Sequence, residues 1–288
     1  MDKGPHLIKK IPDMMNIVKV HKQNQIIGFV PTMGFLHKGH ISLIQSARKD
    51  NDIVVVSIFV NPKQFAPNED IDRYPRNIKR DIEICREQGV DYIFYPCAEE
   101  MYPNGFQTSV SLSELTKGLC GKSRPTHFSG VTTVLTKLFN IIQPDNVYFG
   151  QKDAQQAVIV KQMIKDLNYP ITMHILPIIR EDNGIAMSSR NKYLSAGQMK
   201  NAEVLNKSLK LAETLIKQGE RNCNRLKKII YHKIENENRN SNANIKIDYI
   251  EIVNFDNLQP IENVRTNTLI AIAVFIGQTR LIDNIVIK

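Results

Sequence analysis

Two histidines, His37 and His40, lie three residues apart in the segment PTMGFLHKGH, which spans residues 31–40. The segment follows a β-rich run and precedes an apolar-periodic stretch, which predicts a glycine-containing turn between a strand and a helix. At a helix start this spacing places both imidazoles on one side. Because free backbone N–H groups and the helix dipole favour an anion there, we interpret the pair as hydrogen-bond donors to a phosphate. The alternatives are half of a metal site, without a nearby third ligand, or two solvated side chains.

A glutamine, Gln64, lies in the segment NPKQFAPNEDIDRYPR, directly after a predicted strand that ends at Val60. Asn61 and Pro62 stop that strand, so we expect the glutamine on a loop at the same sheet edge as the histidines. Its amide can accept a hydrogen bond from a hydroxyl and donate one to a carboxylate. Taken alone, the segment also fits an ordinary polar loop.

A lysine, Lys152, lies in the segment YFGQKDAQQ, again at a predicted strand end, a glycine and a helix start. A lysine at such a turn is a mobile point charge suited to phosphate, but taken alone the segment fits a plain surface lysine better. Asp153 fits the N-cap of the following helix, which Gln156 helps to open. Upstream, His127 in RPTHFSGV fits a packing residue as well as a site residue.

Two adjacent hydroxyls, Ser188 and Ser189, precede Arg190 in the segment REDNGIAMSSRNKYL. Two hydroxyl donors and a guanidinium fork can bind a triphosphate, whereas the alternative is a linker that contains a serine cap. The segment falls at the junction of two predicted domains, where ligand sites are common. We therefore expect it to close over the ligand as a clamp.

The N-terminal part of the chain alternates short apolar runs with amphipathic stretches, from which we expect strands at residues 26–30, 53–60, 92–95, 147–149 and 171–176. The nearly continuous apolar run IVVVSIFV is typical of a strand covered on both faces. The fold class predicted is α/β, a Rossmann-like doubly wound parallel sheet. Ligands of such sheets bind beyond the carboxyl ends of the strands.

The pattern changes after about Ile179. Ser195 can cap a helix that extends to about Gly219, and Leu226, Ile230 and Ile234 lie on one face of a second helix. We expect the Asn-rich residues 235–244 to form an exposed loop, followed by strands at 245–253, 269–276 and 281–287. The predicted organisation is a nucleotide-binding domain of residues 1–178 and a smaller α+β C-terminal lid domain of residues 179–288.

The composition fits a globular chain. Apolar residues make up 42% and charged residues 23% of the 288 residues, which disfavours disorder, collagen and coiled coil. The four cysteines show no CxxC spacing, so we expect a reduced, cytoplasmic protein. No apolar run approaches the roughly 20 residues that span a bilayer, so no membrane is expected as a partner.

The formal net charge of +9 and the pI of about 9.3 indicate an acidic partner. Nucleic acid is disfavoured because the basic residues are spread along the chain, without a helix-turn-helix or an RNA-recognition signature. A phosphorylated small molecule is the better expectation.

Taken together and in this order, the four segments resemble the pantothenate synthetase (pantoate–β-alanine ligase) family of the nucleotidyltransferase superfamily. The shared motifs are PTMGxLHxGH, NPxQF with a downstream YPR, FGxKDxQQ and AMSSRNxYL, and they cover about Gly28 to Leu194. The residues beyond Leu194 carry no motif. Their assignment to the family's small C-terminal domain rests on length and pattern.

The resemblance implies an ATP-dependent condensation of (R)-pantoate with β-alanine to pantothenate, in the biosynthesis of that vitamin and of coenzyme A. Pantoate would first form pantoyl adenylate with release of pyrophosphate, and β-alanine would then displace AMP. The family uses Mg²⁺ with the ATP phosphates, rather than a metal held by a protein motif, and no organic cofactor. It is typically a homodimer.

The resemblance also implies roles for individual residues. His40 falls at the family's proton-donor position, and Gln64 and Gln156 match its pantoate-binding pair, Gln64 also lying where β-alanine arrives. The expected catalytic residues are His37, His40, Lys152, Ser188, Ser189 and Arg190. The expected ATP contacts are Pro31, Thr32, Met33, Gly34, His37, Gly39, His40, Gly150, Gln151, Lys152, Asp153, Ile179, Met187, Ser188, Ser189 and Arg190. Gln151 departs from the acidic residue that many relatives have there.

Two other functions remain as alternatives. Another nucleotidyltransferase would share the HxGH turn but should lack the two glutamines and the FGxKDxQQ segment. A noncatalytic RNA-binding protein would explain the basic pI but would need no pairing of HxGH with MSSR, and its binding should weaken steeply with salt.

Overall fold

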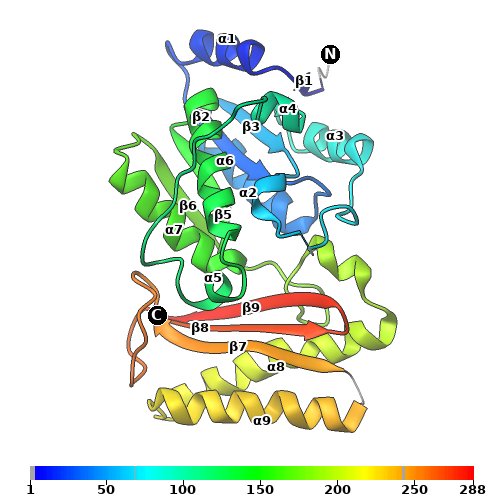
Figure 1. Ribbon diagram of the computed structural model, residues 1–288, viewed down its shortest axis with the longest axis vertical. Coiled ribbons are helices and arrows are strands. Elements are labelled where there is room, and N and C mark those ends of the chain that lie inside the picture. Colours follow the sequence, from blue (N-terminus) through cyan, green and yellow to red (C-terminus); the bar gives the residue numbers. More distant parts are fainter. Residues whose placement is uncertain (1–3, 68, 242–243) are drawn as a thin grey trace. The chain divides into compact units, whose positions relative to one another are not determined.

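The computed structural model describes residues 4–67, 69–241 and 244–288, and their internal contacts divide the chain into two compact units. The first unit contains the residues up to Glu114, Arg124–Gln151 and Ile159–Pro177. The second contains Leu115–Ser123, Lys152–Val158 and Ile178–Lys288. Each unit has its own sheet and its own apolar core (Figure 1).

The first unit is built on a six-stranded sheet in the order β1-β4-β3-β2-β5-β6, and every neighbouring pair is parallel. This confirms the predicted α/β class with a parallel sheet. The strands are β1 (His6–Ile8), β2 (Ile27–Thr32), β3 (Ile53–Ile58), β4 (Tyr92–Phe94), β5 (Asn146–Gly150) and β6 (Thr172–Leu176).

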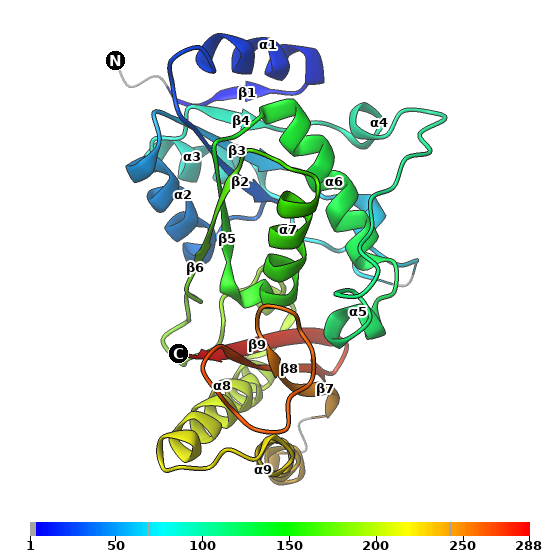
Figure 2. The same cartoon turned by 90° about the vertical axis from the view of Figure 1, so that its left-hand side faces the viewer.

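Helices cover both faces of this sheet, as Figure 2 shows. One face packs against α1 (Ile11–His21), α6 (His127–Ile142) and α7 (Ala154–Asp166). Helix α7 is shared between the units, and its residues 159–166 belong to the first. The other face packs against α2 (Lys38–Asp50) and α3 (Ile78–Glu87). Successive strand residues alternate between these two cores, so the strands are apolar on both sides and read as continuous apolar runs.

Strand β1 and helix α1 were not predicted. β1 has only three residues, two of them exposed, so it carries no apolar run. α1 begins with Ile11 and Pro12 and buries two residues fully, Met14 and Val18. The short helix α4 (Ala98–Met101) also belongs to the first unit. Among the described residues, no helix is long and apolar enough to cross a membrane.

The second unit contains an antiparallel three-stranded sheet of β7 (Ile245–Asn254), β8 (Thr268–Ile276) and β9 (Thr279–Ile287). One face of the sheet packs against α8 (Ala196–Lys217) and α9 (Cys223–Ser241). The other packs against α5 (Leu119–Ser123) and the first residues of α7. The predicted cap of α8 is confirmed, because Ser195 Oγ accepts from the Gln198 backbone N–H and Gln198 Oε1 accepts from that of Ser195.

The expected loop at residues 235–244 is wrong over most of its length, because α9 continues to Ser241. Ile234 is fully buried and anchors the last part of the helix. Asn238 then binds both backbone groups of Ile245, donating to its carbonyl at 3.1 Å and accepting from its N–H at 2.8 Å. Tertiary contacts therefore outweigh the low helix propensity of asparagine. Residues 242–243 lie outside the described residues.

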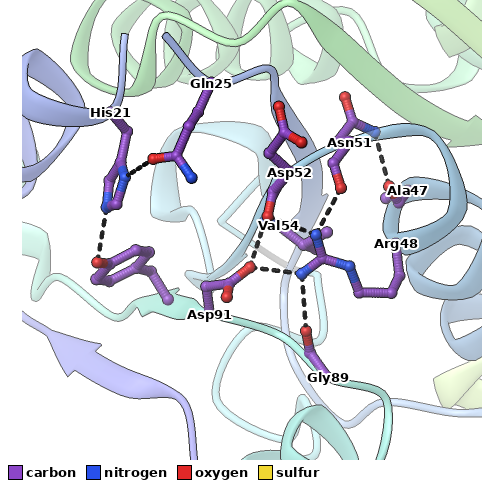
Figure 3. A network of polar contacts seen from close by, with 10 residues as sticks. His21, Gln25, Ala47, Arg48, Asn51, Asp52, Val54, Gly89 and Asp91 are labelled. Atoms are coloured by element: carbon purple, nitrogen blue, oxygen red, sulfur yellow. Dashed lines mark hydrogen bonds and ion pairs between the residues drawn. The ribbon is translucent and has the colours of Figure 1, made fainter. Parts of the chain in front are cut away.

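A polar network fixes the amino-terminal ends of β3 and β4, at the sheet edge away from the motif segments (Figure 3). At its centre, Arg48 of α2 donates to the carbonyls of Gly89, Asn51 and Asp52 and to Asp91 Oδ2 at 2.7 Å. The same Asp91 oxygen accepts from the Val54 backbone N–H at 2.7 Å. One guanidinium thus ties the end of α2 to two strands.

We predict that Arg48→Ala lowers the free energy of unfolding by about 1–3 kcal/mol, because backbone carbonyls and a carboxylate lose their donor. Arg86→Ala is the matched control, since the ion pair of Arg86 with Glu83 is exposed, and it should change stability by within about 0.5 kcal/mol. Urea unfolding of both variants measures the difference. Equal losses would show that the Arg48 network stabilises the fold no more than an exposed ion pair does.

Candidate functional site

Three neighbouring strands of the first unit, β3, β2 and β5, end in three of the motif segments. β2 leads into the turn that precedes α2, and β3 leads into a 3₁₀ turn, η1 (Pro62–Gln64). β5 ends at Gly150, after which η2 (Gln151–Asp153) begins. The carboxyl ends of parallel strands share one edge of a sheet. The order β3-β2-β5 therefore brings the histidine turn, Gln64 and Gly150 to that edge, at a topological switch point.

The turn after β2 is held in shape by a carboxylate from α3. Asp81, which is 1% exposed, accepts from the backbone N–H of Phe35 at 2.7 Å and of Leu36 at 2.8 Å. Burial raises the pKa of Asp81, and the two N–H groups oppose that rise. Gly34 has φ +81°, and a Cβ there would lie 2.8 Å from Ile58 Cγ2 and 3.1 Å from Asp81 Oδ2. The turn therefore needs both the glycine and the buried acid.

Asp81 is a site-supporting residue that the sequence analysis missed. A signal was present, because Asp81 lies three residues after Ile78 and four before Cys85, on the apolar stripe of the sequence that forms α3. An acidic residue at such a position is buried when the helix packs on the core, so its carboxylate needs hydrogen-bond donors.

The two histidines lie side by side at the start of α2. Their ring centroids are 4.0 Å apart with an interplanar angle of 34°. His37 is the N-cap, and its Nδ1 accepts from the Gly39 backbone N–H at 3.2 Å, while His40 Nδ1 accepts from the His37 backbone N–H at 3.3 Å. Because Nδ1 accepts in both rings, the proton of each neutral imidazole is on Nε2. This is the tautomer in which Nε2 serves as a donor.

A metal site at the two histidines would need further ligands close to them. Within residues 4–67, 69–241 and 244–288, no group of three or more His, Cys, Asp and Glu side chains is arranged to hold a metal ion.

The side chain of Gln64 contacts the histidine turn. Its Nε2 lies 3.1 Å from the sulfur of Met33, and its Oε1 accepts from Asn61 Nδ2 at 3.0 Å. Asn61, which is 1% exposed, also donates to the Gly130 carbonyl of α6 at 3.0 Å. Gln64 thus joins the loop to the turn through Met33, and Asn61 joins the loop to α6 through the Gly130 carbonyl.

The backbone of Gln64 is also held. Its carbonyl accepts from Arg124 Nη2 at 3.2 Å and from His127 Nδ1 at 2.9 Å. Arg124 binds both carboxylate oxygens of Glu69. Burial opposes the charge of Glu69, but the guanidinium outweighs it and lowers the pKa of the carboxyl. His127, which the sequence left between packing and function, therefore supports the glutamine loop.

In the second unit, Lys152 and Asp153 belong to η2, which precedes α7. Lys152 Nζ lies 3.7 Å from Asp153 Oδ1, and the Asp153 side chain is about half exposed. The next two glutamines differ in environment. Gln155 is buried and donates to the carbonyls of Leu115 and Gly118, whereas Gln156 is partly exposed. Only Gln156 is therefore positioned at the surface of its unit.

The remaining predicted residues form a hairpin in the second unit. Arg180 pairs with Ala186, and the Met187 backbone N–H donates to the Ile179 carbonyl at 3.0 Å. This brings Ile179 and Met187 together. Ser188 then caps η3 (Ser189–Tyr193) by accepting from the backbone N–H of Arg190 at 3.3 Å. Ser189 is buried, and Ser188 and Arg190 are partly exposed.

The predicted site residues thus fall into two groups, one in each unit. The first group offers imidazole N–H donors at a helix start and the amide of Gln64. The second offers Lys152, Arg190 and two hydroxyls. Donors and cations of this kind stabilise charge on a phosphoryl group.

The sequence was compared with known families and proteins. A sequence profile described as Pantoate-beta-alanine ligase matches residues 6–286. The pantothenate synthetase of Caldicellulosiruptor saccharolyticus is 54% identical, over 98% of this chain and 99% of that one. The enzyme of the same name from Acetivibrio thermocellus is 50% identical, over the same shares.

Solved structures give the same result. Pantothenate synthetase from Thermus thermophilus is 38% identical with a TM-score of 0.89, over 97% of this chain and 98% of that one. Pantoate-beta-alanine ligase from Francisella tularensis, complexed with beta-gamma ATP and β-alanine, is 35% identical with a TM-score of 0.79, over 98% and 97%.

We predict that Gly130→Ala destabilises the first unit, because the new Cβ would lie 2.2 Å from the Lys63 carbonyl oxygen and 2.6 Å from Gln64 Cα. Backbone atoms cannot rotate away, so overpacking should lower the free energy of unfolding by about 1–3 kcal/mol. Gly197→Ala, in the first turn of α8 with open space at Cβ, is the control and should cost nothing. Chemical unfolding compares the two, and equal stabilities would contradict the close approach.

Proposed function

The chain belongs to the pantoate–β-alanine ligase family and is an ATP-dependent ligase of pantothenate biosynthesis, and from this premise we propose how its own residues carry out the condensation. Pantoate carboxylate attacks the α-phosphorus of ATP, which forms the P–O bond of pantoyl adenylate and expels pyrophosphate. The amine of β-alanine then attacks the acyl carbon, loses a proton and displaces AMP. The observation that carries the proposal is the pair of adjacent imidazoles at the start of α2, both with Nε2 as the donor.

His37 and His40 bind the phosphates in this proposal. Attack at phosphorus moves negative charge onto nonbridging oxygens and the leaving pyrophosphate, so donors fixed in advance lower the barrier. The Nδ1 bonds to backbone N–H groups fix the orientation of the rings. His40 is assigned as the proton donor of the pair.

Gln64 and Gln156 bind pantoate. A primary amide can donate to the carboxylate and accept from a hydroxyl of this substrate. The fixed backbone of Gln64, held by Arg124 and His127, supports a role in orientation. The same loop is assigned to the arriving β-alanine, because the carboxylate carbon of pantoate is the atom that reacts in the second step.

Lys152, Ser188, Ser189 and Arg190 complete the phosphate contacts, and Ile179 and Met187 contact the nucleotide. Arg190 carries a planar fork suited to two phosphate oxygens, while Lys152 is a mobile point charge. The remaining ATP contacts are those assigned by the resemblance, from Pro31 to His40 and from Gly150 to Asp153.

Mg²⁺ would accompany ATP, since phosphate oxygens are the hard ligands that it prefers and it usually retains several waters. A homodimer is part of the same proposal and rests on the resemblance alone. A cytoplasmic location is also proposed, and it rests on the scattered cysteines without CxxC spacing.

We predict that His40→Ala and Lys152→Ala each lower the rate of AMP release by at least about a hundredfold with pantoate, β-alanine and ATP, the usual cost of losing one transition-state donor. His232→Ala and Lys228→Ala, on the exposed side of α9, are the matched controls and should keep the parental rate. A coupled assay of AMP release measures all four. Near-normal turnover in a folded His40 or Lys152 variant would refute the assigned role.

A second prediction tests the order of steps. Labelled pyrophosphate should exchange into ATP when pantoate and Mg²⁺ are present and β-alanine is absent, because adenylation is then reversible on the enzyme. Arg190→Ala should lower this exchange about a hundredfold, and Arg190→Lys should recover only part, since the charge returns without the fork.

A concerted reaction would behave differently, because pyrophosphate would leave only when the amine attacks. Absence of exchange in a preparation that makes pantothenate would therefore exclude the two-step mechanism while leaving the family unchanged.

A further inference from the structure

Strand β9 carries two adjacent polar residues that are almost completely buried. Asp283 is 2% exposed and Asn284 is 3% exposed, although β9 is an edge strand of its sheet. Neighbouring residues of a strand face opposite sides of the sheet. Burying a carboxylate or an amide costs free energy unless the group is hydrogen-bonded. The partners of these two side chains therefore indicate their structural role.

Asp283 binds Arg180, the first residue of the hairpin that leads to the predicted phosphate ligands. The two carboxylate oxygens accept from Arg180 Nη1 at 2.7 Å and Nη2 at 3.0 Å. The guanidinium is held further by the Gly184 carbonyl at 3.0 Å and by the side-chain oxygen of Asn206 at 2.9 Å, in the amide orientation that satisfies both groups. Arg180 therefore has one fixed position.

The fixed position of Arg180 also restrains the residues that follow it, because backbone hydrogen bonds join the two arms of the hairpin. Glu181 and Ile185 are joined by a backbone hydrogen bond of 2.8 Å, and Met187 is bound to Ile179. Gly184 has φ +88°, and a Cβ there would lie 2.8 Å from the nearest atom of the Asn206 side chain, so the tip of the hairpin packs closely on α8. Ser188–Arg190 come directly after this closed hairpin.

On the opposite face of β9, Asn284 holds the other phosphate segment of the same unit. Its Nδ2 donates to the backbone carbonyl of Lys152 at 2.9 Å. The Asn284 backbone N–H also donates to Asp283 Oδ1 at 2.7 Å, which links the two residues directly. Two consecutive side chains therefore reach two segments that are far apart in the chain, one at Lys152 and one that begins at Arg180.

We propose that Asp283 and Asn284 are positioning residues for the adenylation step, which hold Lys152 and the Met187–Arg190 segment at a fixed separation from a single strand. The inference rests on the proposed assignment of those two segments to the phosphates of ATP. Neither residue touches the substrate. They act through Arg180 and through the backbone of Lys152, and a displacement of about 1 Å at such ligands can cost about a hundredfold in rate.

The test compares two aspartates that each bind an arginine. Asp283 of β9 binds Arg180, and Asp248 of β7 binds Arg280 of β9. Asp283→Asn removes the charge that holds Arg180. Asp248→Asn is the matched control, because Asp248 Oδ2 accepts from Arg280 Nε at 3.0 Å and Nη2 at 2.7 Å and so joins β7 to β9. Both pairs are largely buried, but only the first leads to the phosphate segments.

Two half-reactions of the full-length enzyme are measured, namely pyrophosphate exchange with pantoate and ATP, and pantothenate formation from added pantoyl adenylate and β-alanine. Asp283→Asn should lower kcat/KM for ATP in the exchange by about ten- to a hundredfold and leave the second half-reaction within about twofold of the parent. Asn284→Ala should show the same split. Asp248→Asn should leave both half-reactions within about twofold of the parent.

Circular dichroism shows whether Asp283→Asn folds. If it does not, Asn284→Ala alone tests the positioning role. Equal losses in both half-reactions, unchanged exchange in the folded variants, or an equal loss in Asp248→Asn would each overturn the inference. Lys152→Ala and Arg190→Ala are run in parallel. If they abolish exchange while Asp283→Asn and Asn284→Ala do not, only the positioning role fails; if they too leave exchange intact, the assignment of the phosphates fails with it.

Discussion

Burial of the sheet on both faces is the constraint that organises the first unit. β2 and β3 run between two helical layers, and nearly all of their residues are buried. A strand in that position has little room for polar side chains, because each would need a partner inside an apolar core. The chain therefore becomes polar beyond the strand ends, with the Arg48 network at the amino ends and the motif segments at the carboxyl ends. The carboxyl ends are where the histidine turn, Gln64 and Gly150 are found.

The turn after β2 cannot hold its own shape. Gly34 and Phe35 both have positive φ, and the backbone N–H groups of residues 35 and 36 find their acceptor on α3, in Asp81. A neighbouring helix thus provides the order that the turn lacks. The glutamine loop is similar, because Asn61 and His127 connect it to α6. Both motif segments owe their geometry to residues that lie far away in the sequence.

Local patterns predicted much of this structure. The apolar runs at residues 53–60 and 171–176 identify parallel strands, and Ser195 with Gln198 identifies the start of α8. A contact between a helix and the following strand explains the failure at residues 235–241. Asn238 extends α9 through an Asn-rich stretch by binding Ile245, and no local rule includes that contact. The side-chain types at the candidate site were predicted because chemistry restricts them. Asp81 was visible as an acid on an apolar helix stripe, whereas the partners of Asp283 and Asn284 depend on tertiary folding that the sequence does not display.

The second unit is discontinuous in the chain, and this has a consequence for its assembly. Leu119 of α5 and Ala154 and Val158 of α7 cover the face of the sheet that contains Leu269 and Ala271. During synthesis these early segments emerge long before the strands that they cover. Such long-range closure slows folding and leaves apolar surface exposed in the meantime. A fragment that begins at residue 179 would lack the segments that cover one face of its sheet, so the apolar residues of that face would be exposed.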